Sequence, residues 1–274
     1  MLPHLPTLLG ELNRYIKNPG EWDAIKETEQ FITPVPYIVD PPYTKPWGPS
    51  QIRFVCVSDL HSAFRTYEHS LPPGDVFLVG GDITDLSTQS EMIEFCHFLD
   101  SLPYKNKIVV AGNHDTSLLD QGDSKSQMDP KKNPSIQMLN NHCTFLHNEV
   151  TCAQGITVYG ASMPTSALLG TRNNKRETHW DPIPDGVDII LTHLPPLGRG
   201  DQPLGNDGFH QGDSELLKAV RRVRPKVHVF GHKHFNPGVS YDGTTVFINA
   251  AVVMTHVPIV FDLPRPLSHL LNRL

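Results

Sequence analysis

The sequence predicts an α/β fold in which short buried strands alternate with helices. Arg53–Val57, Val76–Val79 and Lys107–Val110 are short apolar runs rich in β-branched residues, as is typical of buried strands. Between the second and third runs, apolar residues recur at helical spacing: Met92, Ile93, Cys96, Leu99 and Leu102. A strand, a helix and a strand in this order indicate parallel pairing through a crossover.

The residues before these strands predict an extension on the domain surface. Within residues 1–20, one helical face is apolar: Leu5, Leu8, Leu9, Leu12 and Ile16. This helix either docks on the domain or is an interfacial or targeting helix. Residues 31–50 are dense in proline, which prevents regular structure and predicts an extended strap. We therefore divide the chain into an N-terminal helix and Pro-rich extension, residues 1–50, packed on a domain formed by residues 51–274.

The remaining elements follow in chain order. Ser87 or Thr88 is the expected cap of the first domain helix. Residues 120–135 are polar without an apolar period and predict a surface loop. Ser214 is the expected cap of a later helix. A second set of strands is predicted at Thr157–Tyr159, Val187–Leu191, Val227–Phe230 and Thr245–Ile248, with Ile259–Phe261 closing a sheet edge.

Composition limits the class of protein. With 274 residues, 38% of them apolar and 19% charged, the chain can bury one large core. It shows neither a long apolar span nor a charged-then-apolar leader, so we expect a cytoplasmic protein that does not span a membrane. The cysteines form no C-x-x-C pattern, which favours free thiols: Cys56, Cys96, Cys143 and Cys152.

The charge distribution disfavours a nucleic acid polymer as partner. The net charge is -6, whereas a dedicated nucleic-acid binder usually shows a basic footprint. The basic run Arg221–Lys226 is better explained as the C-terminal turn of a helix, where cations stabilise the helix dipole.

Five short blocks each end an apolar run with side chains that can bind metal. A mixed set of carboxylate, amide and imidazole ligands of this size suits two divalent ions better than one. Ligand sites in α/β folds gather beyond the carboxyl ends of strands, so these blocks are expected to meet. The blocks are Ser58–His61, Gly80–Asp82, Gly112–Asp115, Leu191–His193 and Gly231–His234.

These blocks resemble the pattern of the calcineurin-like metallophosphoesterase superfamily, which runs D-x-H, G-D, G-N-H-D/E, H and G-H-x-H. The similarity extends from about Arg53 to about Pro266, and this stretch is similar to the metallophosphoesterase-domain-containing subfamily, which is related to class III cyclic nucleotide phosphodiesterases. The resemblance implies a four-layer αββα sandwich of two mixed sheets, with a dinuclear metal site at the carboxyl ends of the strands. Further segments carry it: Pro182–Ile189, Pro195–Gly198, Arg221–Lys226, Ile248–Ala250 and Phe261–Pro264.

The resemblance also implies a ligand set. One divalent ion would be held by Asp59, His61, Asp82 and His234. The second would be held by Asp82, Asn113, His193 and His232, with Asp82 as the bridge. Manganese is the metal we expect, with iron, zinc, cobalt, nickel and magnesium as alternatives. Two such ions, about 3.5–4 Å apart, activate water and clamp the phosphoryl oxygens of an in-line displacement.

His114 is the expected catalytic residue beside the metals. By resemblance it faces the phosphate, where it stabilises charge or protonates the leaving oxygen. Asp115 is the natural partner to fix its tautomer, and a turn or helix cap is the alternative for Asp115. Asp85 is either a partner of the ligands or a turn residue. Lys233, between two ligands, is expected to point away from the metals.

Two backbone features are expected to support the ligands. Asp59–His61 and His232–His234 are spaced so that, in an extended chain, each pair would point to one side. Gly81 and Gly231 precede ligands and are expected to permit close backbone approach or unusual φ angles.

The substrate contacts are the least determined part of the site. Asn113 and His114 are candidates, and so is His210, which lies in the Gly/Asp-rich loop 205–213. Relatives tend to carry a Trp-rich segment after the position of Tyr159–Ala161, available to stack on a base. This chain lacks it, which leaves His210 or Trp180 as possible replacements.

We interpret the chain as a phosphodiesterase that hydrolyses small phosphodiesters, such as 2′,3′- or 3′,5′-cyclic nucleotides, by attack of a metal-bridging hydroxide. A phosphomonoesterase acting on proteins or metabolites is an alternative, because ligand sets do not separate mono- from diesterases. A nucleotide-binding scaffold with little catalysis is another, although the intact His232 favours activity. A nuclease is disfavoured by the acidic net charge. A homodimer is left open.

Overall fold

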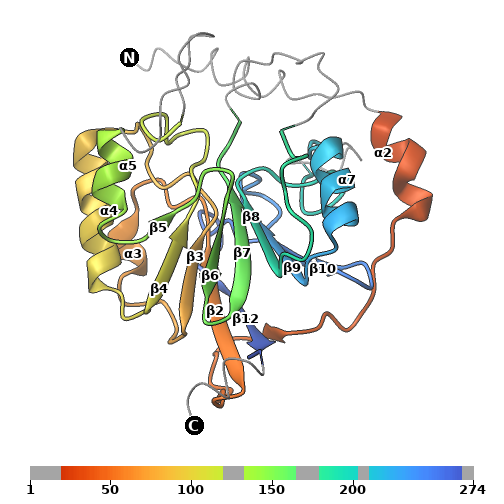
Figure 1. Cartoon of the computed structure of the whole chain (residues 1–274), viewed down its shortest axis with the longest axis horizontal. Coiled ribbons are helices and arrows are strands. Elements are labelled where there is room, and N and C mark those ends of the chain that lie inside the picture. The colour runs from red at the N-terminus through yellow and green to blue at the C-terminus, as the bar shows by residue number, and fades with distance from the viewer. Residues whose placement is uncertain (1–19, 120–132, 165–178, 203–209, 267–274) are drawn as a thin grey trace.

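The computed structural model describes residues 20–119, 133–164, 179–202 and 210–266. Two six-stranded sheets lie face to face, and the described helices flank them on the outer sides, as Figure 1 shows. Helices α3, α4 and α5 lie against one sheet, and α2 and α7 lie on the side of the other. The predicted four-layer sandwich of two mixed sheets is therefore confirmed.

The strands and helices have the following bounds. The first sheet is formed by β1 Ile38–Val39, β12 Ile259–Pro264, β2 Gln51–Val57, β3 Val76–Val79, β4 Asn106–Val109 and β5 Thr144–Phe145, in this order. The second is formed by β10 Gly238–Tyr241, β11 Val246–Asn249, β9 Val227–Phe230, β8 Ile189–Thr192, β7 Ile156–Ala161 and β6 Glu149–Ala153. The described helices are α2 Gly20–Ile25, η2 Lys26–Thr28, α3 Phe64–Tyr67, α4 Gln89–Ser101, α5 Pro134–Leu139 and α7 Ser214–Val223.

Each sheet has a parallel centre. In the first sheet β2, β3, β4 and β5 run parallel, while β12 pairs antiparallel with β2 and β1 pairs antiparallel with β12. In the second, β11, β9, β8 and β7 run parallel between the antiparallel edge strands β10 and β6. Parallel neighbours deliver their carboxyl ends to one edge of a sheet, which is where the site is built.

Strand β2 shows why the sheets are buried on both faces. Phe54 and Cys56 join the core between the two sheets, whereas Val55 and Val57 join the core beneath the helices. Successive side chains of a strand point to opposite faces, so a strand covered on both sides is apolar throughout. This explains the continuous apolar runs in the sequence.

Helix α4 starts as predicted, and α7 does not. Thr88 caps α4 in a capping box with Glu91. The prediction that Ser214 caps α7 is wrong, because Asp213 accepts the N–H groups of Glu215 and Leu216. The two residues are adjacent and both are good caps, so only the backbone geometry decides between them.

Two further predictions are corrected. The polar stretch 120–135 lies largely outside the described residues, but its end starts α5, capped by the side chain of Asn133. Ile259–Phe261 does not close the sheet edge, because the two-residue strand β1 pairs outside β12. The Pro-rich strap therefore contains a short strand.

Residues 20–31, which follow the predicted first helix, contact the side of the domain that the second sheet forms. The helix within residues 1–19 lies outside the described part of the chain, but α2 lies beside α7 in Figure 1. Glu29 forms ion pairs with Arg199 and Arg221, and Arg199 also stacks on Phe31. These contacts hold residues 29–31 against the domain.

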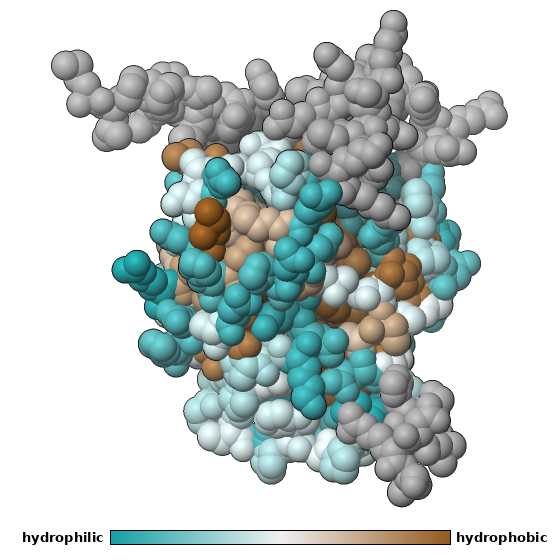
Figure 2. Space-filling view, turned by 60° about the vertical axis from the view of Figure 1, so that its left-hand side comes forward, coloured by the Kyte–Doolittle hydropathy of each residue, from teal (hydrophilic) through white to brown (hydrophobic). Residues whose placement is uncertain are grey.

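The surface of the α4 side is mainly hydrophilic. Figure 2 shows teal side chains over much of this face, with apolar areas between them. All four cysteines are free, as predicted. Within the described residues, no helix combines the length and apolar character needed to cross a bilayer.

Candidate metal centre

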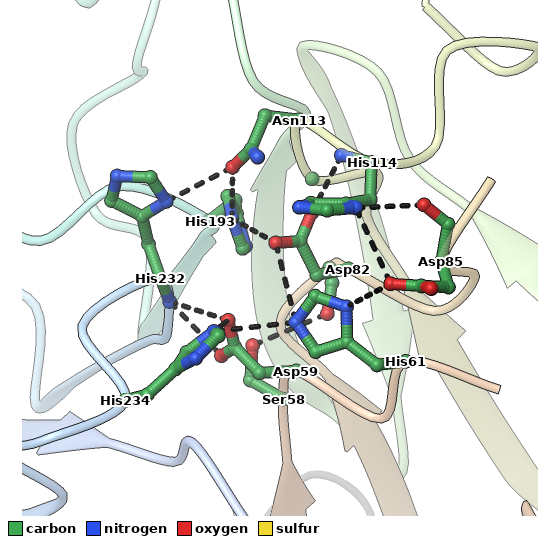
Figure 3. Close-up of polar contacts among 12 residues, drawn as sticks. Ser58, Asp59, His61, Asp82, Asp85, Asn113, His114, His193, His232 and His234 are labelled. Carbon is green, nitrogen blue, oxygen red and sulfur yellow. Dashed lines mark hydrogen bonds and ion pairs between the residues drawn. The ribbon is translucent and has the colours of Figure 1, made fainter. Parts of the chain in front are cut away.

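Five loops bring the candidate ligands together at one end of the sandwich. They follow β2, β3, β4, β8 and β9, which are parallel strands of the two sheets. A bridge between Ser58 and Ala251 and the close approach of Gly231 to Asp59 join the loops of the two sheets. Figure 3 shows the side chains converging on Asp82.

The first cluster contains all four residues predicted for one metal. The ligand atoms of Asp59, His61, Asp82 and His234 lie within 4.8 Å of one another. His61 Nε2 is 3.2 Å from His234 Nε2, and His234 Nε2 is 3.0 Å from Asp59 Oδ1. His61 Nε2 is 3.9 Å from Asp82 Oδ2. Two imidazole nitrogens and two carboxylates thus face a common point.

The second cluster shares Asp82. The ligand atoms of Asp82, His193 and His232 lie within 4.8 Å of one another. The amide oxygen of Asn113 is 3.0 Å from His193 Nε2 and 2.9 Å from His232 Nδ1. His193 Nε2 is 3.3 Å from Asp82 Oδ2, the same oxygen that faces His61 in the first cluster.

The hydrogen bonds of His193 show that a cation fits this cluster. Its Nδ1–H donates to the carbonyl of Gly80 at 2.8 Å, so Nε2 of the neutral ring carries a lone pair. That nitrogen faces the oxygens of Asp82 and Asn113, which are acceptors. Burial alone lowers the pKa of His193, but the Asp82 carboxylate outweighs it and raises the pKa to about 9. Either a proton or a metal ion must lie between these acceptors, and metal binding would displace the proton.

The pKa shifts of three further candidate ligands agree with a metal site. Burial lowers the pKa of His232 well below its usual value, which keeps this ring neutral as a ligand must be. Burial also lowers the pKa of His61. Burial opposes ionisation of Asp82, but His193 outweighs it and lowers the pKa of Asp82, which remains a carboxylate. Nitrogen and oxygen ligands of this kind suit divalent ions of intermediate hardness.

The ligand backbone is not extended, contrary to the prediction for the two i, i+2 pairs. Asp59, His61, Asp82 and His232 have φ angles of 59°, 43°, 48° and 68°. Non-glycine residues rarely adopt such angles, and in native proteins this strain gathers at functional sites.

The predictions for the two glycines are confirmed. Gly81 has a φ of 94°. A Cβ on Gly231 would overlap the Ser58 hydroxyl and the Asp59 carboxylate, so only glycine permits this approach.

Comparison with known proteins identifies the family. The sequence profile of the calcineurin-like phosphoesterases matches residues 52–236, a span that holds every residue of both clusters. The chain belongs to the calcineurin-like phosphoesterase family. Family and geometry together support a dinuclear site for divalent metal ions and the activity of a phosphoric ester hydrolase.

Curated relatives cover nearly the whole chain. Human metallophosphoesterase domain-containing protein 1 is 38% identical over 94% of this chain and 86% of its own length. The mouse protein of the same name matches to the same extent. Among solved structures, the phosphopantetheinyl hydrolase PptH of Mycobacterium tuberculosis superposes with a TM-score of 0.50 over 75% of this chain and 90% of its own. At 14% identity, that likeness bears on the fold alone.

The partner of His114 in this phosphoesterase is Asp85. His114 Nδ1–H donates to the backbone carbonyl of Asp85 at 2.8 Å, and the Asp85 carboxylate is 3.7 Å away. The same carboxylate is 3.4 Å from His61 Nδ1, as Figure 3 shows. The side chain of His114 is 39% exposed, so a substrate can reach it.

The prediction that Asp115 orients His114 is wrong. Asp115 is fully buried and accepts N–H groups of Gly112, Ile83 and Thr84 and the hydroxyl of Thr84. It therefore joins the loop after β3 to the loop after β4, which is the turn role considered as the alternative. Burial and the nearby Asp82 raise the pKa of Asp115 to about 6.

Two polar residues support the His232–His234 loop. Lys233 points away from the clusters, as predicted, and its ammonium donates to Gln211 at 2.7 Å. Burial lowers the pKa of Lys233 to about 8. The buried amide of Asn249 donates to the carbonyls of Lys233, Asn236 and Gly200. The sequence contains Asn249 at the end of a strand, but nothing there indicates this role.

His210 and Trp180 lie apart from the clusters. The Nδ1 nitrogen of His210 is 2.6 Å from Asp201 Oδ1, and its ring packs against Trp22. Trp180 is 2% exposed and belongs to the core, so it is not available to stack on a base.

Glu91 is a supporting residue that sequence reasoning missed. Its carboxylate accepts from the hydroxyls of Ser62 and Thr88 and from the backbone of Asp85, Leu86 and Thr88. It thus joins the residue after His61 to the loop that orients His114. The T-x-x-E pattern of Thr88 and Glu91 is the signal that would have pointed to Glu91.

Proposed function

We propose that this phosphoesterase is a dinuclear metal-dependent phosphodiesterase that acts on small phosphodiesters, with cyclic nucleotides as the favoured class. The observation that carries this proposal is the position of Asp82 Oδ2. It faces His61 of the first cluster at 3.9 Å and His193 of the second at 3.3 Å. A carboxylate oxygen placed between two ligand sets is what a bridging ligand requires.

The proposed ligands follow from the two clusters. Asp59, His61, Asp82 and His234 would hold one ion, and Asp82, Asn113, His193 and His232 the other. When bound, two divalent ions supply an activated water and Lewis-acid stabilisation of phosphoryl oxygens. Manganese is the proposed metal, on the mixed imidazole and carboxylate character of the ligands.

The chain's own residues orient the reaction. His114 Nδ1–H is held by the Asp85 carbonyl, which leaves Nε2 as the nitrogen that meets the substrate. A protonated Nε2 can donate to a phosphoryl or leaving-group oxygen, and a transferred proton would neutralise the alkoxide. The backbone N–H of His114 donates to Asp82 Oδ1 at 2.9 Å, which ties the catalytic ring to the bridging carboxylate.

Within the described residues, the one cation of the ligand loop is directed away from the clusters, which supports a diester over a monoester. A phosphodiester carries one negative charge, and a phosphomonoester dianion needs more positive charge to hold it. Lys233 lies within the ligand loop, yet its ammonium is directed to Gln211 and not to the clusters. This arrangement supports the diesterase, and a rate comparison tests it.

The test compares bis(p-nitrophenyl) phosphate with p-nitrophenyl phosphate, which release the same chromophore. Metal-reconstituted protein should show a higher kcat/KM for the diester, and Asp82→Asn should lose this activity. A higher kcat/KM for the monoester would favour a phosphomonoesterase. Nucleotide binding without turnover of either compound, with two ions bound, would favour a scaffold. A panel of 2′,3′- and 3′,5′-cyclic nucleotides then defines the substrate.

A further inference from the structure

A cavity of about 330 Å³ lies beside the ligand loop and is separate from the two metal clusters. Its apolar walls are Phe31, Phe230 and Phe247. Phe230 and Phe247 are buried on the outer face of the second sheet, whereas Phe31 is 59% exposed at the rim. Ligand pockets start at about this size and are lined mainly by apolar side chains with a few polar groups.

The polar groups of the cavity are placed by the protein. His210 lines it, and Asp201 holds the Nδ1 of this ring at 2.6 Å. Asp201 is itself fixed, because its other oxygen accepts the N–H groups of Gly198 and Gly212. The carboxylate takes Nδ1–H, so Nε2 is the ring nitrogen left for a ligand. The Gln202 amide nitrogen lies 3.5 Å from that nitrogen and also lines the cavity.

The N-terminal segment completes this arrangement. The ring of Trp22 lies 4.3 Å from the ring of His210, measured between centroids, and fills the space beside Gly198. Arg199 is buried between Phe31 and Phe247 and bonds to the carbonyl of Gln30. Residues 22–31 therefore set the position of both His210 and the rim of the cavity.

The cavity is connected to the metal ligands through the loop that carries them. Asn236 and Asn249 line it, and the Asn249 amide holds the carbonyls of Lys233 and Asn236. On the other side of that loop, Gln211 accepts from Lys233, and Gln211 is the neighbour of His210. A group in the cavity would thus lie against the segment that presents His232 and His234.

We propose that this cavity is a subsite for a planar heterocycle with polar edges, of the nucleobase type, with His210 as its polar contact and the ring of Phe230 as its main apolar wall, since Arg199 packs on the rings of Phe31 and Phe247. The proposal rests on the proposed function in one respect: the heterocycle would be the non-reacting part of a nucleotide substrate. Aromatic walls hold a flat ring, and a fixed imidazole nitrogen with an adjacent amide can read its hydrogen-bonding edge.

The first test uses binding alone, so that it does not depend on catalysis. Adenosine and guanosine are titrated into the full-length protein without added metal, and binding is measured by calorimetry. We expect saturable binding that His210→Ala weakens about fivefold to tenfold, as for the loss of one buried hydrogen bond. Ser240→Trp, which places a large side chain at the cavity wall, should abolish it. His69→Ala removes an exposed histidine outside the cavity and should leave it unchanged.

The second test uses matched substrates. A nucleoside 2′,3′-cyclic phosphate is compared with methyl ribofuranoside 2′,3′-cyclic phosphate, which has the same scissile bond and no base. His210→Ala should raise KM for the nucleotide about fivefold to tenfold and leave the kinetics of the base-free compound unchanged. Equal losses on both compounds would show that His210 only supports the loop.

Two results would overturn the subsite. The first is that nucleosides show no saturable binding. The second is that nucleosides bind but neither His210→Ala nor Ser240→Trp changes the binding. If nucleosides bind as expected but no diester is hydrolysed, the subsite stands and the phosphodiesterase proposal falls.

Discussion

The Nδ1 nitrogen of His114 lies 2.8 Å from the backbone carbonyl oxygen of Asp85, and the side chain of Asp85 faces both His114 and His61. One residue, three positions after Asp82, therefore contacts the proposed catalytic imidazole and a candidate metal ligand. Because a carbonyl can only accept, this contact fixes the tautomer of His114 with Nε2 toward the substrate side. The geometry assigns to Asp85 the role that the sequence suggested for Asp115.

Asp85→Asn should lower kcat while leaving the fold intact. The backbone carbonyl that orients His114 remains, but the carboxylate facing His61 and His114 is lost. Partners of metal ligands typically contribute ~10–100-fold to activity or metal affinity, and we expect a loss of kcat in this range. The measurement is kcat with a saturating diester, and an unchanged kcat would contradict the role of Asp85.

Asp115→Asn should affect stability, in contrast to Asp85→Asn, which should leave the fold intact. The amide nitrogen of asparagine would face the N–H groups that the buried carboxylate now accepts. We expect a loss of ~1–3 kcal/mol in the free energy of unfolding, because buried donors lose their acceptor. Denaturant unfolding measures it. If Asp115→Asn is as stable as the wild type, its role as a link between loops is wrong.

Glu91→Gln should destabilise the protein near neutral pH and reduce its sensitivity to acid. Burial opposes ionisation of Glu91, but hydrogen bonds from Ser62 and Thr88 outweigh it and lower its pKa to about 2. A carboxyl whose folded pKa is depressed stabilises the fold above its unfolded value, near 4.5, and this stabilisation is lost as pH falls toward 2. Loss of the capping box alone costs ~1 kcal/mol.

Thermal unfolding of wild type and Glu91→Gln between pH 7 and pH 3 checks this. The difference in Tm should be largest at pH 7 and should shrink below pH 4.5. Glu94→Gln, on the same helix without these bonds, is the matched control. A difference in Tm that stays constant with pH would show that the charge of Glu91 is not responsible.

His228 should make the fold sensitive to mild acid. This buried ring donates from Nε2 to the hydroxyl of Thr192, which itself donates to the Leu194 carbonyl. Burial lowers the pKa of His228 to about 3. The unfolded chain takes up a proton near pH 6.5 that the folded chain refuses until about pH 3, so stability falls as pH decreases between these values.

One such group lowers the free energy of unfolding by about 1.4 kcal/mol for each pH unit below pH 6.5. His228→Leu should therefore be less stable than wild type at pH 7.5, because Thr192 loses its donor, and should lose less stability on going to pH 5. Denaturant unfolding at the two pH values measures the difference. Parallel losses in both proteins would contradict a neutral, buried His228.

Gly231→Ala should damage the metal centre specifically. The new methyl group would overlap the Ser58 hydroxyl and the carboxylate of Asp59, so the ligand loop must shift. A displacement of this kind can cost about a hundredfold in rate, and we expect kcat/KM to fall at least that far. Gly48→Ala is the matched control, since a Cβ there meets nothing within 4 Å. Equal activity of the two variants would contradict the close approach.

Much of the fold could be predicted because its strands are apolar on both faces. Val76–Val79 and Val227–Phe230 have the predicted bounds, since each is a short β-branched or aromatic run that ends at a glycine. The ligand blocks follow directly, because a buried strand that stops at a ligand places it at the sheet edge. The structure brings all seven proposed ligands together for this reason.

The predictions that were wrong depend on contacts between distant segments, which local sequence patterns do not encode. Asp115 directly follows His114, whereas Asp85 lies 29 residues before it, and the turned backbone after Asp82 is what brings Asp85 to His114. The strand β1 exists because Ile38 and Val39 meet Phe261 and Val260, a pairing between distant segments. The extended geometry expected for Asp59–His61 was replaced by positive φ angles, which the surrounding loops impose.

We propose that Asp82 joins two metal sites, and the number of metal ions bound per chain is the measurement that decides this. Metal-free protein is titrated with Mn²⁺, and bound metal is measured after equilibrium dialysis for wild type, His61→Ala, His193→Ala and Asp82→Asn. We expect two ions per chain in wild type, one in each histidine variant and weakened binding of both ions in Asp82→Asn. One ion per chain in wild type, or two tightly bound ions in Asp82→Asn, would contradict it.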